Sequence, residues 1–180
     1  MKTSPVADPA ETDTAQLGKL LEGCLHTIDQ CDYLLQQINE DSYSQSGERI
    51  ASIGSHMRHI LDRFQCFFNG LGERYIDYDA RTRDKSIETN LQAAQFAVVT
   101  MGRRLQELDI SPAAQLRVRE TVYHLSPGVE VESTVAREIM GLVTHTTHHL
   151  AIIGIIARGL GFKLDRDFGK AASTIVFESS

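Results

Sequence analysis

Apolar residues recur every three or four positions along four stretches of the chain, the spacing that places them on one face of an α-helix. The first three stretches cover about residues 14–40, 48–69 and 86–108. Ser86 is a candidate N-cap of the third stretch. The fourth starts after Ser133 or Thr134 as N-cap and runs to about Gly159 or Gly161, where a glycine can end a helix. We therefore predict four long amphipathic helices.

Residues 116–132 change from a period of about 3.6 to a period of 2, around a Ser-Pro-Gly turn, and this predicts a short β-hairpin. Residues 70–86 have no helical period and carry many charges, so we expect an ordered loop that helps to form a site. The predicted fold class is all-α: an up-down four-helix bundle with a small β-hairpin before the last helix.

The two ends of the chain differ in composition. Residues 1–12 contain two prolines and mostly small or acidic residues, which predicts a flexible leader. Residues 162–180 are too apolar to remain free in solvent, and we expect them to pack back on the helices. The length suits one domain, so residues 13–180 are expected to form a single unit.

The charge balance limits the partners of the chain. Its 180 residues include 18 Lys and Arg against 24 Asp and Glu, for a formal net charge of −6. Without a basic cluster, this charge argues against nucleic acid or an anionic membrane. The longest apolar stretch, residues 150–157, is far shorter than the ~20 residues that span a bilayer. No signal-peptide core is visible, so we expect a cytoplasmic protein whose three cysteines are reduced.

Five of the seven histidines fall in two clusters, His56 and His59 on the second helix and His145, His148 and His149 on the fourth. His145 and His149 are four residues apart and interrupt an otherwise apolar face. Side chains with this spacing lie about 5 to 6 Å apart on a helix. Two neutral imidazoles so placed can bind one metal ion, with a third ligand from a facing helix. The pattern therefore predicts a metal site between the two helices.

The helical pattern does not decide whether His56 or His59 is the third ligand. His56 borders the apolar stripe of its helix, while His59 falls nearer Ser52 and Arg63. A single histidine on an apolar face is more often a hydrogen-bonded core residue, but two at this spacing with a second cluster favour a metal. The spacing H-x-x-x-H also occurs in zinc peptidases, which place a glutamate after the first histidine. Here that position is Thr146, so a peptidase is not expected.

The histidine clusters and their surroundings resemble the DinB-like (damage-inducible) superfamily of metalloenzymes. The resemblance covers roughly residues 14–162 and is carried by SIGSHMRHILDRF, IDYDARTRD and AREIMGLVTHTTHHLAII. It implies a four-helix bundle whose three metal ligands are His59, His145 and His149. The same resemblance implies that His56 and His148 lie next to the metal ligands or face the substrate.

The resemblance also implies a class of activity. Some members of the superfamily are transferases or isomerases that use low-molecular-weight thiols. We therefore expect one divalent transition metal (zinc, nickel or iron) in an enzyme of thiol-dependent transferase or hydrolase-type chemistry. The alternative is a non-enzymatic metal-binding or stress-response protein. The expected partners are an unidentified small-molecule substrate, with a low-molecular-weight thiol as candidate, and a second copy of the chain if it forms a homodimer.

Two carboxylates are candidates for orienting water or a ligand imidazole. Asp62 lies three residues after His59, and Glu138 lies two turns before His145; an ordinary surface or salt-bridge role is the alternative for both. A substrate-sized pocket with converging polar groups from the 70–86 loop, such as Tyr75, Tyr78 or Arg81, would favour the enzyme. A metal sealed under aliphatic side chains would favour sensing or a structural role.

Overall fold

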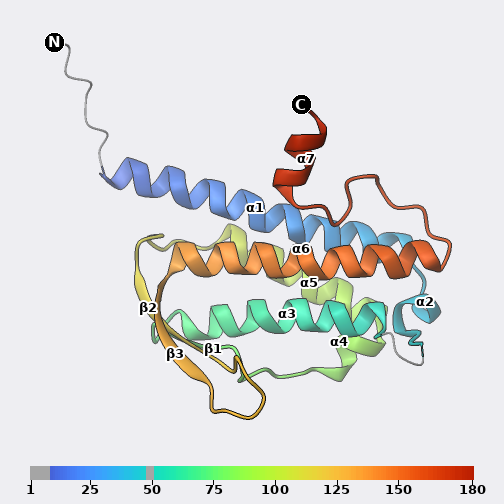
Figure 1. Ribbon diagram of the computed structural model, residues 1–180, viewed down its shortest axis with the longest axis horizontal. Helices are drawn as coiled ribbons and strands as arrows, with labels where there is room; N and C mark the ends of the chain where they lie inside the picture. Colours follow the sequence, from blue (N-terminus) through green and yellow to red (C-terminus); the bar gives the residue numbers. More distant parts are fainter. Residues whose placement is uncertain (1–8, 48–50) are drawn as a thin grey trace.

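The computed structural model describes residues 9–47 and 51–180, which form a mostly helical protein with a small three-stranded sheet (Figure 1). The helices are α1 (Pro9–Gln37), α2 (Glu40–Ser44), α3 (Ile53–Gly70), α4 (Lys85–Thr89), α5 (Leu91–Gln106), α6 (Val135–Gly159) and α7 (Ala172–Glu178). The strands are β1 (Tyr75–Asp77), β2 (Gln115–Glu120) and β3 (Val129–Thr134). The predicted helical class is thus confirmed in outline.

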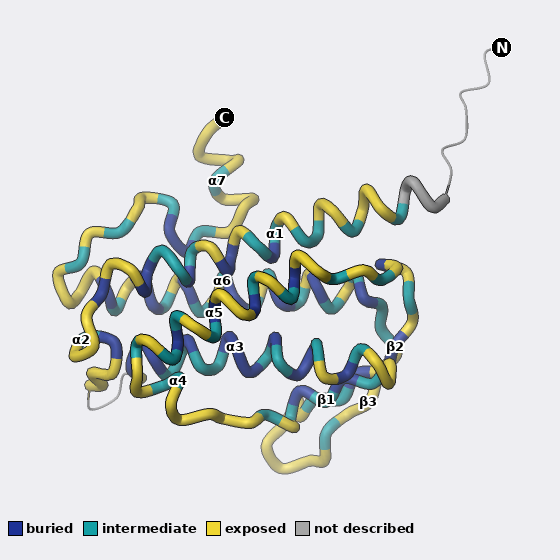
Figure 2. The backbone as a smooth tube through the Cα atoms, turned by 180° about the vertical axis from the view of Figure 1, so that it is seen from behind, coloured by how far each residue is buried: buried dark blue, intermediate teal, exposed yellow. Residues whose placement is uncertain are grey.

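The four long helices lie side by side, and their apolar stripes face one another. Helix α1 contacts α5 and α6, and α3 contacts the same two helices. Figure 2 shows the buried positions on the inward faces of these helices. The largest fully buried side chains on them include Leu34, Leu35, Ile53, Met57, Ile60, Phe64, Phe67, Leu105, Ile139 and Leu142. The hydrophobic periodicity therefore predicted the core-facing side of each long helix.

The alternating directions of an up-down bundle do not hold for α5, and this part of the prediction is wrong. Glu88, just before α5, lies beside Gly54 at the start of α3, whereas Arg104 near the end of α5 donates to Gln65 in the second half of α3. Helices α3 and α5 therefore run in the same direction. The physical reason is the connection 71–90, which returns along the length of α3 before α5 begins (Figure 1).

The third predicted helix is divided into two. Asp84 accepts a hydrogen bond from the Ser86 backbone N–H and caps α4, and Asn90 accepts one from the Ala93 N–H at 2.8 Å and caps α5. Asn90 has an extended backbone, which interrupts the helix between the two caps. Ser86 is consequently not the N-cap that the sequence suggested, because the preceding aspartate and the later asparagine take both capping positions.

The second long helix begins later than its periodicity predicted. Ser52 accepts a hydrogen bond from the Ser55 N–H at 3.0 Å, so α3 starts at Ile53 rather than near residue 48. Residues 48–50 of the predicted start lie outside the described residues. A β-carbon on Gly54 would lie 2.0 Å from the Glu88 carbonyl oxygen, so the absence of a side chain there allows α4 to pack against α3.

The predicted hairpin is present as β2 and β3, but it is part of a larger sheet. Strand β1 pairs in parallel with β2, in the register Tyr75 with Arg117 and Ile76 with Val118. Ile76 is fully buried, and the Tyr78 N–H donates to the Arg119 carbonyl at 2.9 Å just after the strand. The ordered loop expected at 70–86 is thus held by backbone pairing at its centre. This fixes the start of the segment that continues toward α4.

The two ends of the chain partly match expectation. Residues 9–12 of the expected leader belong to α1, and residues 1–8 lie outside the described residues. The tail packs back at Phe168, which is buried, and at Gly169, whose N–H donates to the Gln30 side chain at 2.7 Å. Beyond this contact, α7 projects from the helices and exposes Phe177 (Figure 1).

Helix α6 is long and apolar enough to cross a membrane when judged by length and composition alone. The core helix of a folded domain passes the same test. Here α6 packs against α1 and α3 and buries Ile139, Leu142 and Leu150 among them. We therefore interpret α6 as a central helix of the fold, and it is the helix that carries three histidines.

Candidate metal centre

Three histidines from α3 and α6 converge in the structure. One ring nitrogen from each of His59, His145 and His149 lies within 4.8 Å of the others. The ring centroid of His59 is 4.8 Å from that of His145 and 4.7 Å from that of His149, and the two rings of α6 are 4.5 Å apart. Spacing along α6 and contact between α3 and α6 together produce this cluster, which could hold a metal ion.

Burial keeps these imidazoles neutral. Desolvation, with a contribution from the Arg63 charge, lowers the pKa of His145 to about 3. Desolvation and the neighbouring histidines lower the pKa of His149 to about 4, and desolvation followed by the Arg81 charge also lowers the pKa of His59. A neutral imidazole keeps one nitrogen lone pair, which is what a metal ligand requires.

His145 has an unpaired nitrogen. Its Nε2 atom is buried and has no hydrogen-bond partner among the described residues. Leaving a buried polar atom unsatisfied is costly, and such an atom in a native fold calls for an explanation. A metal ion held by three neutral imidazoles would satisfy this atom, so the donor set fits a divalent transition metal.

The two remaining histidines of the clusters take different positions. Nδ1 of His56 lies 3.0 Å from Nδ1 of His149, so one of these rings donates a proton to the other. His148 is exposed, although its ring centroid lies 5.2 Å from that of His149. The structure therefore brings His56 into direct contact with a candidate ligand and leaves His148 at the surface beside it.

The two candidate carboxylates are held by other groups. Asp62 is buried and accepts from Arg58 at 2.8 Å and from the Arg83 N–H at 3.2 Å, and none of the hydrogen bonds among the described residues joins it to His59. Glu138 accepts from the hydroxyls of Tyr78 at 2.8 Å and Ser133 at 2.6 Å. Asp62 thus anchors the loop after β1, and Glu138 positions Tyr78.

A cavity of about 280 Å³ opens beside the histidine cluster. Its walls come from α3, from the segment after β1, from the end of β2 and from α6. The lining residues are His59, Arg63, Tyr78, Asp79, Arg81, Glu120, Thr121 and His145. Tyr78 and Arg81 were expected here from the sequence, whereas Tyr75 instead donates to Glu130 at 2.9 Å, away from the cavity. The cavity is small and predominantly polar.

Four residues of this cavity were not identified as site residues from the sequence. Arg63 lies four residues after His59 on the same helix face, and this spacing was the available signal. Arg63 binds both carboxylate oxygens of Glu120, at 2.5 and 3.0 Å, and its guanidinium covers the Tyr78 ring at 3.9 Å. Asp79 and Thr121 are joined by a 2.8 Å hydrogen bond across the β1–β2 end of the sheet, a pairing with no local sequence signal.

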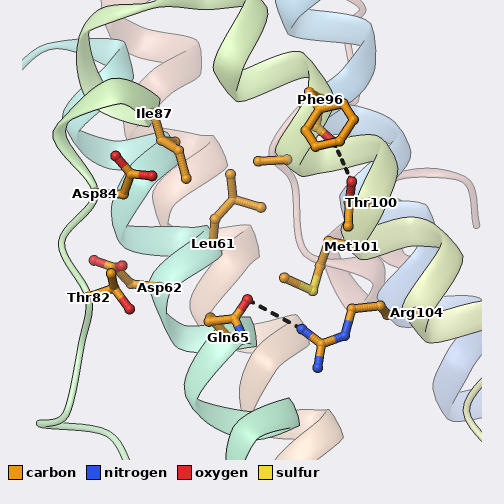
Figure 3. Close-up of a pocket in the computed structure, with 11 residues that line it drawn as sticks. Leu61, Asp62, Gln65, Thr82, Asp84, Ile87, Phe96, Thr100, Met101 and Arg104 are labelled. Carbon is orange, nitrogen blue, oxygen red and sulfur yellow. Dashed lines mark hydrogen bonds between the residues drawn. The ribbon is translucent and has the colours of Figure 1, made fainter.

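A second cavity, of about 270 Å³, lies between α3 and α5 (Figure 3). Leu61, Ile87, Met101 and the exposed Phe96 give it a mostly apolar wall, and Arg104 donates to Gln65 at its edge. It contains none of the clustered histidines. The histidine cluster and this cavity are therefore separate features of α3.

The cysteines and the isolated histidines take no part in the cluster. Cys24, Cys31 and Cys66 are free thiols, as expected, and burial raises the pKa of Cys24 and of Cys31 to about 12. Such thiols stay protonated and unreactive at neutral pH. His26 contacts Gln30 on the outside of α1, and His124 is exposed in the hairpin connection.

Comparison with known protein families identifies the family of the chain. The model of the DinB family matches residues 12–165, and the chain belongs to that family. The resemblance drawn from the histidine motifs is thus confirmed at the level of the family. No curated protein and no solved structure matches the chain significantly.

Proposed function

We propose that His59, His145 and His149 bind one divalent transition metal and that the chain is a metal-dependent enzyme acting on a small molecule. The observation that carries this proposal is the convergence of three neutral imidazole nitrogens within 4.8 Å. His145 has an unpaired nitrogen, and His145 and His59 line a polar cavity. We further infer that α1, α3, α5 and α6 form one four-helix bundle that holds the ligands rigidly.

The cavity favours an enzyme over a protein that only holds or senses a metal. Three protein ligands leave coordination positions open, which is characteristic of catalytic sites. The cavity beside His59 and His145 is lined by the charged and hydroxyl groups of Arg63, Tyr78 and Arg81 instead of a layer of aliphatic side chains. A non-enzymatic metal-binding or stress-response role would be favoured by a sealed site.

The chain itself would position the reacting groups. A metal ion bound here would supply Lewis acidity, lowering the pKa of a water molecule or binding a thiolate. His56 can accept the Nδ1 proton of His149 and so fix the orientation of that ring. Burial and the Glu138 charge raise the pKa of Tyr78 far above its usual range, so this hydroxyl stays protonated and directed at Glu138.

The substrate class follows from the same site. We propose a small substrate, with a low-molecular-weight thiol as substrate or cosubstrate, because the cavity is too small for a macromolecule and an open metal position binds thiolates well. The three cysteines of the chain are buried with raised pKa values or bonded within the fold, so an attacking thiolate would come from outside the chain.

Metal analysis of the untagged protein tests this proposal. We expect about one equivalent of zinc, nickel or iron after purification, and restoration of one equivalent after chelation and reloading. A screen of the reloaded protein with thiol cosubstrates then tests for an enzyme. Failure to bind any of the three metals would refute the proposed site. Stoichiometric metal without turnover would favour the non-enzymatic alternative.

A further inference from the structure

Among the described residues, Arg81 is the cation of the cavity lining whose guanidinium has no hydrogen-bonded carboxylate. Its Nη1 atom lies 3.1 Å from Nδ1 of His59, its Nε atom is buried without a hydrogen-bond partner, and the described residues provide it with no ion pair. Arg63, by contrast, is bound by both oxygens of Glu120. A half-buried guanidinium whose one side-chain contact in the described part of the chain is a neutral ring leaves most of its donors available.

Metal binding would remove even that contact. A neutral imidazole has one nitrogen that donates and one that accepts. If His59 bound a metal through Nδ1, the lone pair that faces Arg81 would be used. If it bound through Nε2, the proton would move to Nδ1, which would then donate. In either case Nδ1 of His59 could no longer accept from Arg81, and the guanidinium would be free to bind another group.

The charges around Arg81 indicate which kind of ligand group it would bind. Glu120 is neutralised by Arg63, and Asp79 accepts from Thr121 at 2.8 Å and from Arg119 at 3.4 Å. Arg119 also binds Asp77 at 3.0 Å, and the Arg81 charge helps to lower the pKa of Asp79. Within residues 9–47 and 51–180, Arg81 is nevertheless the cation of the cavity lining whose guanidinium has no hydrogen-bonded carboxylate. Because the two carboxylates still line the same small space, a group with one negative charge fits better than a dianionic phosphate. The planar fork of arginine matches a carboxylate in particular.

We propose that Arg81 binds the carboxylate of a small monoacid substrate whose second donor group reaches the metal at His59, His145 and His149. This inference rests on the proposed function and adds the chemical class of the substrate. Arg81 comes from the segment held between β1 and α4, so the carboxylate would be recognised by a different part of the chain from the helices that carry the ligands.

Two thiols of equal length, 3-mercaptopropionate and 3-mercaptopropionamide, test the proposal on the cobalt-loaded protein. Both can bind the metal through sulfur, and the cobalt–thiolate absorption band reports their affinity. We expect the carboxylate to bind at least ~10-fold more tightly than the amide, as a charge-assisted hydrogen bond provides. Arg81→Gln should reduce this preference to below about 3-fold, whereas Arg83→Gln, an exposed arginine of the same segment, should preserve it.

The cobalt affinity provides a second readout that needs no substrate. Because Arg81 competes with the ion for His59 and repels it, Arg81→Gln should bind cobalt several-fold more tightly than the wild-type protein. Weaker cobalt binding by this variant would overturn the proposal, and so would equal affinity of the two thiols in the wild-type protein. If the wild-type chain binds no cobalt, the proposed function itself fails and the carboxylate site with it. A normal thiolate band without the preference refutes the carboxylate site alone.

If Arg81→Gln fails to fold, Arg81→Lys is the replacement variant. Lysine keeps the charge but lacks the planar fork, so it should retain an intermediate preference for the carboxylate. If a folded Arg81→Lys variant keeps the full preference for the carboxylate over the amide, charge alone explains the recognition. That result would overturn the bidentate arrangement.

Discussion

Nδ1 of His56 and Nδ1 of His149 lie 3.0 Å apart across the contact between α3 and α6. At this distance one nitrogen must carry a proton and the other must accept it. If His149 is the donor, its Nε2 lone pair is free for a metal, and His56 holds the ring in position. This is the arrangement in which a ligand histidine donates its second nitrogen to a neighbouring acceptor.

The first prediction separates His59 from His56. His59→Ala should abolish stoichiometric metal binding, since it removes one of three ligands. His56→Ala should weaken binding by about 10- to 100-fold, the range for loss of a group that orients a ligand. His56→Gln, which keeps an acceptor, should lose less. Competition titration with a chelator measures all three. Metal loss in His56→Ala with retention in His59→Ala would show that the third ligand has been assigned to the wrong residue.

The second prediction concerns the two ligands on α6. His145→Ala and His149→Ala should each lose the stoichiometric metal, because one α6 imidazole cannot hold it with His59 alone. His26→Ala and His124→Ala are matched controls, since both residues lie away from the cluster. Elemental analysis after dialysis decides the outcome. One normal equivalent of metal in both α6 variants would place the site elsewhere.

The third prediction concerns the stability of the metal-free protein against pH. In the unfolded chain a histidine titrates at about 6.5, whereas burial lowers the pKa of His145 to about 3 and of His149 to about 4. The unfolded state therefore binds more protons between these values, so stability is full above about pH 6.5 and falls as pH decreases toward 4. Urea unfolding at about pH 7.5 and pH 5 should show this loss.

His145→Ala is the control for that titration. Without the most strongly shifted imidazole, the variant should lose less stability than the wild-type protein between the two pH values. An identical pH dependence in both proteins would mean that His145 is not responsible for it.

The fourth prediction tests the close packing at the start of α3. Gly54→Ala should destabilise the protein by about 1–3 kcal/mol, because the new methyl group would meet the Glu88 carbonyl and the Tyr43 ring. This cost exceeds the ~1 kcal/mol by which alanine favours a helix over glycine. A β-carbon on Gly18 of α1 would meet no atom of the other described elements within 4 Å, so Gly18→Ala should be neutral or stabilising. Urea midpoints compare the variants, and equal stability of Gly54→Ala and wild type would contradict the packing.

Local patterns predicted the long helices because each has an apolar stripe that the core requires. They could not predict β1, whose three residues pair with β2 about forty positions later, since nothing in Tyr75–Asp77 by itself encodes a parallel partner. The division of the third helix was missed for a different reason. Asp84 and Asn90 both cap helices strongly, and the apolar period continued across the break between α4 and α5.

The part of the candidate site that depends on spacing along one helix could be predicted from the sequence. The part that depends on contacts between distant segments could not. The separation of four residues between His145 and His149 identified two members of the cluster. The choice of His59 over His56 required the resemblance, because the helical wheel favoured neither and the structure places both against His149. Glu120 could not be assigned to the cavity from the sequence, because it lies there through an ion pair between β2 and Arg63 of α3.

The segment after β1 is fixed at one end by the sheet and at the other by the Asp84 cap of α4, and it supplies Tyr78 and Arg81 without contributing to the histidine cluster. The cavity wall and the histidine cluster are thus provided by different parts of the chain. Substitutions between these two anchor points would alter which molecule is accepted while the imidazoles on α3 and α6 keep their geometry. On the proposed function, changes in this one short segment would alter substrate choice while the metal site on α3 and α6 stays the same.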